Sequence, residues 1–235
     1  GISSSGELYL LDFLKRWWEG KKEYIFFDVG ANKGEYTKTL VRVFPGGKIH
    51  CFEPSAETYR MLKENIGTNG NIILNNFAVS DQVQESRLYY DQEGSGLASL
   101  YNRQLDYYNI DFSKSEMVNV ETLDYYCKKN QIRKIDFLKM DIEGNELKAL
   151  KGAAGLLKEK RIDVIQMEFG GCNIDSRTYF RDFWNLLSGS YYAYRILKNG
   201  LWKITGYTER LECFCNTNYA FIRKDLLKDC EGDIT

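Results

Sequence analysis

Short apolar runs alternate with amphipathic segments along this chain, and that alternation constrains the fold more than any other feature. The apolar runs in the first third are predicted strands, at residues 24–29 (YIFFDV), 48–53 (KIHCFE) and 71–76 (NIILNN). The segments between them, at 35–44 and 55–66, have the pattern of helices. The order β-α-β-α-β is typical of a parallel sheet covered by helices, because parallel neighbours need a crossover connection.

The same alternation returns after residue 120. Helices are predicted at 122–129, 145–158 and 177–187, and strands at 134–140, 161–168, 191–197 and 213–223. A further amphipathic helix is predicted at 7–19, within an N-terminal segment of residues 1–20. Residues 81–120 interrupt the pattern with two short alternating pieces around the stretch GSGLASL, which predicts a β-hairpin insertion, either a lid over a bound acceptor or a plain loop. We expect one domain spanning residues 1–235.

Charge and hydropathy exclude several classes of function. Lys and Arg together number 32 and Asp and Glu together 33, giving a net charge of -1, whereas nucleic-acid binders usually carry a basic excess. We therefore expect no nucleic-acid partner. No run approaches the roughly 18 apolar residues of a membrane span, and the N-terminal region lacks the pattern of a signal peptide. A cytoplasmic protein is expected.

Cysteine and histidine usage narrows the chemistry further. The six cysteines are scattered without a CxxC pair, and Cys213 and Cys215 are expected to share one face of a strand. Free thiols are therefore favoured over a metal site or disulfides, although an even number of cysteines still permits disulfides. The single histidine, His50, lies inside a predicted strand and is interpreted as a core or edge residue. Acid–base chemistry would then fall to carboxylates.

Four predicted parallel strands end in a carboxylate residue: Asp28, Glu53, Asp141 and Glu168. In an open α/β sheet, ligands bind outside the carboxyl ends of the strands. The four acids are therefore expected to converge on one rim of the sheet. Clustered negative charge is unfavourable without a partner, so the ligand should offer positive charge, hydroxyl donors or a metal ion.

The first strand-to-helix turn, DVGANKG, indicates which ligand is bound. Gly30 and Gly34 allow the backbone to approach a ligand closely. Glu53, at the end of the next strand, can accept hydrogen bonds from both hydroxyls of a ribose. The glycine spacing differs from the G-x-G-x-x-G of a dinucleotide site, and the carboxylate of Asp28 disfavours a diphosphate. S-adenosylmethionine, which carries an ammonium group, a ribose and an adenine, fits this pattern better.

These motifs together resemble a known family. The runs FFDVGANKGEYT, HCFEP, NNFAVSD, GLASL, VETLD and FLKMDIEGNELKALKGA, within residues 24–169, look like the FkbM family of S-adenosylmethionine-dependent methyltransferases. The resemblance implies an α/β Rossmann-like class I methyltransferase fold. Its sheet would have seven mostly parallel strands with the last strand antiparallel. It also implies methyl transfer to a hydroxyl oxygen, commonly on a sugar or a polyketide.

The resemblance also implies roles for individual residues. Glu53 would hold the ribose, Phe77 and Ala78 would flank the adenine, and Asp141 would lie beside the sulfonium and the acceptor. The residues placed at the methionine end of the cofactor are Asp28, Gly30, Ala31 and Asn32.

Methyl transfer to a hydroxyl needs an aligned acceptor and a group that removes its proton. Asp141 is our first choice for this base, followed by Glu143 and Glu168. Two other interpretations remain open: Glu143 as an acid that stabilises a helix N-terminus, and Glu168 as a strand-end residue bonded to a nearby loop. The three carboxylates could also bind Mg²⁺ or Mn²⁺, but we assign no metal ligand.

The acceptor is expected to be a small molecule or glycan, with a carbohydrate or glycosylated metabolite preferred. The 17 tyrosines, several of them in the 81–120 insertion, suit sugar binding but also ordinary packing. The alternatives are a polyketide, lipid or protein acceptor, and a non-catalytic module that binds the cofactor only. An NAD-dependent oxidoreductase is disfavoured by the glycine spacing.

Overall fold

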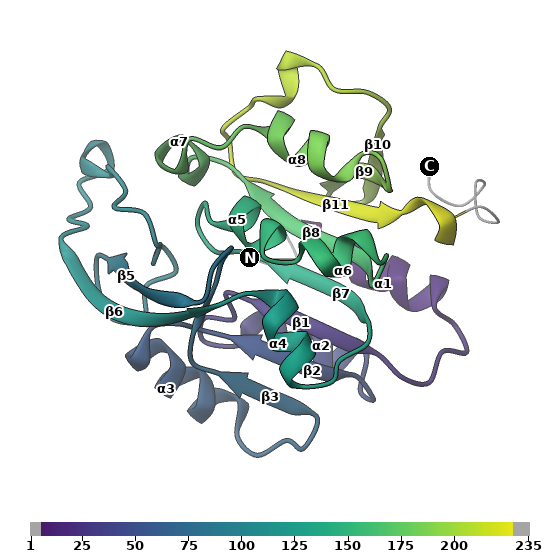
Figure 1. The fold of residues 1–235 in the computed structure, drawn as a ribbon, viewed down its shortest axis with the longest axis horizontal. Coiled ribbons are helices and arrows are strands. Elements are labelled where there is room, and N and C mark those ends of the chain that lie inside the picture. Colours follow the sequence, from purple (N-terminus) through teal and green to yellow (C-terminus); the bar gives the residue numbers. More distant parts are fainter. Residues whose placement is uncertain (1–5, 228–235) are drawn as a thin grey trace.

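The computed structural model describes residues 6–227, which form a central sheet of eight strands (Figure 1). The strand order is β10-β9-β11-β8-β7-β1-β2-β3. The strands β3, β2, β1, β7 and β8 are parallel to one another, and β11 runs antiparallel between β8 and β9. The bounds are β1 Ile25–Val29, β2 Lys48–Phe52, β3 Ile72–Asn75, β7 Ile135–Met140, β8 Ile162–Phe169, β9 Tyr191–Leu197, β10 Gly200–Ile204 and β11 Thr217–Arg223.

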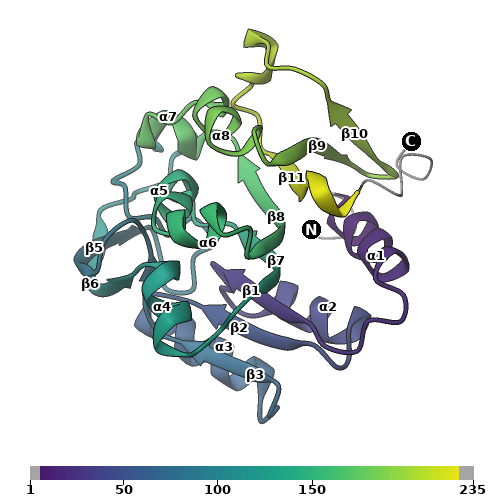
Figure 2. The same cartoon turned by 45° about the vertical axis from the view of Figure 1, so that its right-hand side comes forward.

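Helices cover both faces of this sheet (Figure 2). One layer consists of α1 Glu7–Trp17, α2 Glu35–Val43 and α3 Ala56–Ile66. The other consists of α4 Leu123–Lys129, α5 Glu146–Lys151, α6 Ala154–Lys158 and α8 Phe180–Leu187, and the short α7 Cys172–Ser176 precedes α8.

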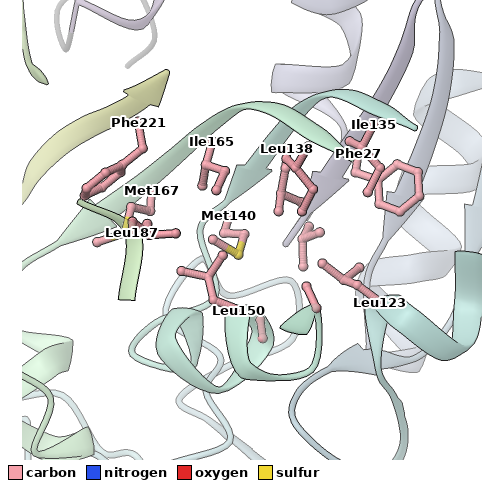
Figure 3. Packing of buried hydrophobic residues seen from close by; sticks show 14 of the residues in the cluster. Phe27, Leu123, Ile135, Leu138, Met140, Leu150, Ile165, Met167, Leu187 and Phe221 are labelled. Atoms are coloured by element: carbon pink, nitrogen blue, oxygen red, sulfur yellow. The ribbon is translucent and has the colours of Figure 1, made fainter. Parts of the chain in front are cut away.

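The two layers follow from the two-residue period of the central strands. In β1, Phe26 packs into the core under α1 and α2, and Phe27 packs into the opposite core. Figure 3 shows this second core, where Leu123 of α4 and Leu150 of α5 meet Leu138 of β7. Because both faces are buried, these strands read as continuous apolar runs in the sequence.

The insertion predicted at residues 81–120 supplies two strands of a small separate sheet, and the residues just before it supply the third. The strands β4 Ala78–Val79, β5 Gln84–Tyr90 and β6 Lys114–Glu121 have the order β4-β6-β5, and β5 pairs antiparallel with β6 as the hairpin prediction requires. A one-turn 3-10 helix, η1 Asp106–Tyr108, lies in the connection between β5 and β6. The hairpin lies beside the main sheet, at the left of Figure 1.

The main sheet has one strand more than the seven predicted. The unpredicted β10 forms an antiparallel hairpin with β9 through a two-residue connection and lies at the edge of the sheet. The predicted strand at 213–223 begins only at Thr217, so Cys213 and Cys215 are exposed residues of the preceding loop and not strand residues. Within residues 6–227, no helix is long and apolar enough to cross a membrane.

Two predicted helices are shorter than expected. The segment 145–158 is divided into α5 and α6 at Gly152, where the chain passes so close to Ser80 that a Cβ would lie 2.1 Å from its carbonyl oxygen. The helix predicted from residue 177 begins at Phe180, where Asp182 and Tyr179 form a capping box.

Candidate active site

The carboxyl ends of β1, β2, β7 and β8 meet at one rim of the main sheet, as the four strand-end acids predicted. Glu53, Asp141 and Glu168 line cavities at this rim. Asp28 differs because its side chain is fully buried, one residue before the end of β1.

Asp28 supports the site from inside the protein. Its carboxylate accepts a hydrogen bond of 2.6 Å from the Thr37 hydroxyl and lies 3.2 Å from the Lys139 Nζ. Lys139 also donates to the Gly30 carbonyl at 3.1 Å, and its Nζ lies 3.9 Å from Asp141. Asp28 was predicted to line the methionine end of the cofactor. Its buried carboxylate instead contacts Lys139, which in turn holds the carbonyl of Gly30 in the turn that follows β1.

Lys139 is a site residue that the sequence analysis missed. Burial lowers the pKa of its ammonium group, but Asp28 and Asp141 more than offset this effect, so that its pKa lies above the usual value. The signal was present in the sequence, because a lysine inside an apolar strand is rarely buried without a charged partner.

The turn after β1 brings the backbone close to the next parallel strands. Gly30 has φ +81, and a Cβ there would lie 1.9 Å from the Asp141 carbonyl oxygen. The amides of Gly30 and Ala31 both donate to the Phe52 carbonyl at the end of β2. Asn32, also at positive φ, donates its amide to the Glu53 carboxylate at 3.0 Å. The turn is thereby fixed to β2 and to the loop after β7.

Glu53 is buried and held in place by backbone amides. It accepts hydrogen bonds of 3.0 Å from the amides of Asn32 and Ser55. Burial raises the pKa of Glu53 to about 7, although these two amide bonds act in the opposite direction. The carboxylate lines a cavity and retains the capacity to accept hydrogen bonds from a ligand.

The first cavity, of about 200 Å³, lies between this rim and the insertion. Its wall on the sheet side includes Glu53, Phe77, Ala78 and Asp141, four of the predicted cofactor residues. The opposite wall comes from the insertion, with Leu88, Ser95, Gly96, Ala98 and Leu100. The insertion thus covers the side predicted to hold the adenosine, and not only an acceptor.

The second cavity, of about 340 Å³, adjoins the first. Gly30, Asn32 and Asp141 line both cavities, so the two meet at these residues. The second cavity is otherwise lined by Ala31, Lys139, Glu168 and neighbouring polar residues, including Glu7 of α1.

Asp141, Glu143 and Glu168 form a compact carboxylate cluster where the two cavities meet. One oxygen of each lies within 4.8 Å of one oxygen of both others. Burial and the neighbouring Asp141 raise the pKa of Glu143 and of Glu168 to about 8. The side chain of Asp141 is 45% exposed. The cluster therefore holds two carboxyls poised near neutral pH beside one that faces solvent.

Glu143 does not cap a helix, which corrects one of the interpretations left open. Helix α5 begins only at Glu146, and Glu143 lies before it at φ +52. The acid in the first turn of α5 is Glu146, which is fully buried and accepts hydrogen bonds from the amides of Ile142 and Gly144 in the preceding loop. Glu143 instead lines the first cavity.

Arg103 of the insertion is the second residue that the sequence analysis missed. This buried guanidinium contacts the Glu143 carboxylate at 2.5 Å and Asp175 of α7 at 3.4 Å. The Ser99 hydroxyl donates to the Glu143 carbonyl at 2.7 Å. The Asn32 side chain donates to the Ser95 carbonyl at 2.9 Å. These four polar contacts fix the insertion against the rim and α7.

His50 is a core residue, as expected. Its Nδ1 lies 2.8 Å from the Tyr126 hydroxyl, and burial lowers the pKa of the imidazole to about 4. It lines neither cavity at the rim.

A match to a protein-family model identifies the family of this chain. Residues 28–196, which include the four strand-end acids and Glu143, match the model of the methyltransferase FkbM domain. The chain belongs to the FkbM methyltransferase family. A curated relative of this FkbM-family chain is the 2-O-methyltransferase NoeI of Sinorhizobium fredii, which is 24% identical over 152 residues. The match covers 60% of this chain and 62% of NoeI, less than two thirds of that protein.

A solved structure shows the same fold at low sequence identity. The methyltransferase domain of METTL16 is 12% identical and has a TM-score of 0.50, with 92% of the FkbM-family chain and 66% of that chain covered. A precorrin-6y C5,15-methyltransferase from Geobacter metallireducens is 10% identical with a TM-score of 0.44, covering 92% and 89%. The likeness to METTL16 concerns the Rossmann-like fold alone.

Proposed function

We propose that this protein is an S-adenosylmethionine-dependent O-methyltransferase that methylates a hydroxyl of a carbohydrate or a glycosylated metabolite. The observation that carries the proposal is the position of Asp141, which lies where two adjoining cavities meet. One of these cavities is lined by Glu53, the acid predicted to bind the ribose hydroxyls. The family membership and the 2-O-methyltransferase NoeI as a relative support transfer to oxygen.

The residues present fit the cofactor. In the proposed arrangement the adenosine occupies the first cavity, where Glu53 accepts hydrogen bonds from the ribose hydroxyls and Phe77 and Ala78 flank the adenine. The methionine end extends past Gly30, Ala31 and Asn32 into the second cavity. Carboxylates at the meeting point offset the positive charge of the ligand.

The chemistry then rests on alignment and proton removal. When bound, the cofactor supplies a methyl group on a sulfonium, and displacement needs the acceptor oxygen in line with the breaking bond. In this proposal Asp141 orients the acceptor hydroxyl and takes its proton, a role supported by its position lining both cavities and by its partly exposed side chain. The adjacent Glu168, whose pKa of about 8 keeps it mostly protonated at neutral pH, shares a hydrogen bond with Asp141. The proton taken by Asp141 then leaves to solvent, to which its side chain is 45% exposed.

The metal-dependent alternative is less favoured by the contacts of the cluster. Three carboxylates within 4.8 Å have the oxygen ligands that Mg²⁺ or Mn²⁺ prefers. The guanidinium of Arg103, however, already lies 2.5 Å from the Glu143 carboxylate and supplies its positive partner.

A cytoplasmic location is proposed as well, because Cys51, Cys127 and Cys172 are buried free thiols, which suits a reducing compartment.

The replacement Asp141→Asn tests the proposed function. It keeps the shape of the side chain but removes the base, so we expect methyl transfer to fall by about 10²-fold or more while S-adenosylhomocysteine still binds. Calorimetry measures the binding, and transfer of labelled methyl groups to a panel of neutral glycans measures turnover. Unchanged turnover in the variant would contradict the role of Asp141. Wild-type protein that fails to bind S-adenosylhomocysteine would contradict the proposed function itself.

A further inference from the structure

Two adjacent tyrosines at the tip of the insertion are displayed to solvent. Tyr107 and Tyr108 of η1 are 67% and 68% exposed, and their ring centroids lie 4.6 Å apart. The chain on either side is anchored, because Leu105 and Phe112 are buried. The backbone of this segment thus holds both rings in solvent, although removing their apolar surface from water would stabilise the protein.

The two rings follow closely in the sequence after a residue that contacts the candidate active site. Arg103 contacts Glu143 of the carboxylate cluster, and the amide of Gln104 donates to Asp175 of α7. Tyr107 follows Arg103 by four residues, which span at most about 14 Å of extended chain. The tyrosine pair is therefore within reach of a ligand that extends outward from the cluster.

Helix α7 presents further exposed apolar side chains beside the same contact. Ile174, next to Asp175, is 57% exposed, and Tyr179, just after α7, is 52% exposed. Exposed rings and apolar groups thus occur on both segments that Arg103 joins, the insertion and α7. Such gatherings on a protein surface commonly mark interaction sites.

We propose that Tyr107 and Tyr108 form a platform for an oligosaccharide acceptor, binding a sugar unit beyond the one that is methylated. This inference rests on the proposed function and extends it from a single sugar to a glycan chain. A tyrosine offers an apolar face for the C–H face of a sugar and a hydroxyl for hydrogen bonds to its oxygens.

The charges around the platform favour a neutral glycan over a nucleic acid. Stacking of unpaired bases on aromatic rings is usually combined with a positively charged groove that follows the phosphates. The tyrosines are instead flanked by the exposed acidic residues Asp106 and Asp111. Arg103, the arginine nearest to them in the sequence, is already engaged with two acids. Carboxylates repel phosphates but accept hydrogen bonds from sugar hydroxyls.

The test compares four proteins: the wild type, Tyr107→Ala/Tyr108→Ala, Tyr107→Phe/Tyr108→Phe and Trp202→Ala. Trp202 is a matched control, since it is an exposed aromatic residue on β10, away from the insertion (Figure 1). Each protein is applied, with S-adenosylhomocysteine, to an array of neutral oligosaccharides and to single-stranded RNA. Affinities for the glycans that bind are then measured by calorimetry, and methyl transfer to them is measured separately.

We expect the double alanine variant to bind the glycans at least roughly tenfold more weakly than the wild type. The double phenylalanine variant should retain most of the affinity and the Trp202 control all of it. Equal glycan affinity in the double alanine variant, wild-type binding to RNA alone, or no glycan binding by the wild type would overturn the platform. Glycan binding that depends on the tyrosines without any methyl transfer would contradict the proposed function and leave the platform standing.

Discussion

At the scale of single residues, Arg103 lowers the pKa of one carboxyl of the cluster, that of Glu143. Burial and Asp141 raise the pKa of Glu143, whereas the guanidinium of Arg103 lowers it. At the resulting pKa of about 8, one residue of the insertion, Arg103, stabilises the ionised form of Glu143. Arg103 therefore acts as a positioning residue that also keeps Glu143 partly ionised near neutral pH.

Replacing Arg103 by alanine should move the pH dependence of methyl transfer. Without the guanidinium the pKa of Glu143 rises, so that ionised carboxylate appears only at higher pH. If activity requires an ionised cluster, the acidic limb of the plot of kcat/KM against pH shifts toward alkaline pH. Arg103→Lys, which keeps a charge but lacks the planar fork, should shift the limb less. A variant with lower activity but an unmoved limb would show that Arg103 has a purely structural role.

At the scale of elements, the turn between β1 and α2 depends on a close backbone approach. Gly30→Ala would place a Cβ 1.9 Å from the Asp141 carbonyl oxygen at a φ of +81, which ordinary residues rarely adopt. We expect a loss of at least about 2 kcal/mol in the free energy of unfolding and weaker cofactor binding. Gly46→Ala is the matched control, because no atom lies within 4 Å of its added Cβ. Urea unfolding of both variants checks the prediction, and equal stability would contradict it.

The elements also show why one part of the site could be predicted from the sequence and another could not. Glu53, Asp141 and Glu168 were found because the carboxyl ends of parallel strands meet at one edge, whatever the loops do. The contact between Arg103 and Glu143 joins residues 40 positions apart, one of them in a connection without regular structure. No periodicity constrains such a connection, so its partner could not be read from the pattern.

The same reasoning explains the differences in the fold. The buried strands β1, β7 and β8 give continuous apolar runs, which makes them easy to recognise. The edge strand β10 contains the exposed Trp202 and Lys203 and follows β9 after a tight turn, so its pattern is short and mixed. Its place in the sheet is set by pairing with β9, a tertiary contact that the local sequence does not specify.

At the scale of the whole molecule, the buried acids of the site make stability depend on pH. Burial raises the pKa of Glu53 and Glu146 to about 7 and that of Glu143 and Glu168 to about 8, from a usual value of 4.5. The folded protein therefore binds more protons than the unfolded chain between pH 4.5 and about 8. Their contribution to stability is fully present below that window and is lost as the pH rises through the folded-state pKa values.

His50 acts in the opposite direction but in a lower range. Burial lowers the pKa of its imidazole from 6.5 to about 4, so its contribution is present above pH 6.5 and is lost as the pH falls toward 4. Above pH 6.5 the four glutamates therefore decide the slope of stability against pH among these five groups.

We expect the melting temperature of the cofactor-free protein to fall by several degrees between pH 6.5 and pH 8.5, since 1 kcal/mol corresponds to roughly 2–4 °C at this chain length. Glu168→Gln removes one titrating carboxyl that accepts no backbone amide hydrogen bond among the contacts described for residues 6–227. This variant should lose less stability over the same interval. Differential scanning calorimetry in buffers of matched ionic strength measures both slopes. A wild-type melting temperature that stays constant or rises would mean that these carboxyls are already ionised at neutral pH. The base assigned to the cluster would then have to work with a lower pKa.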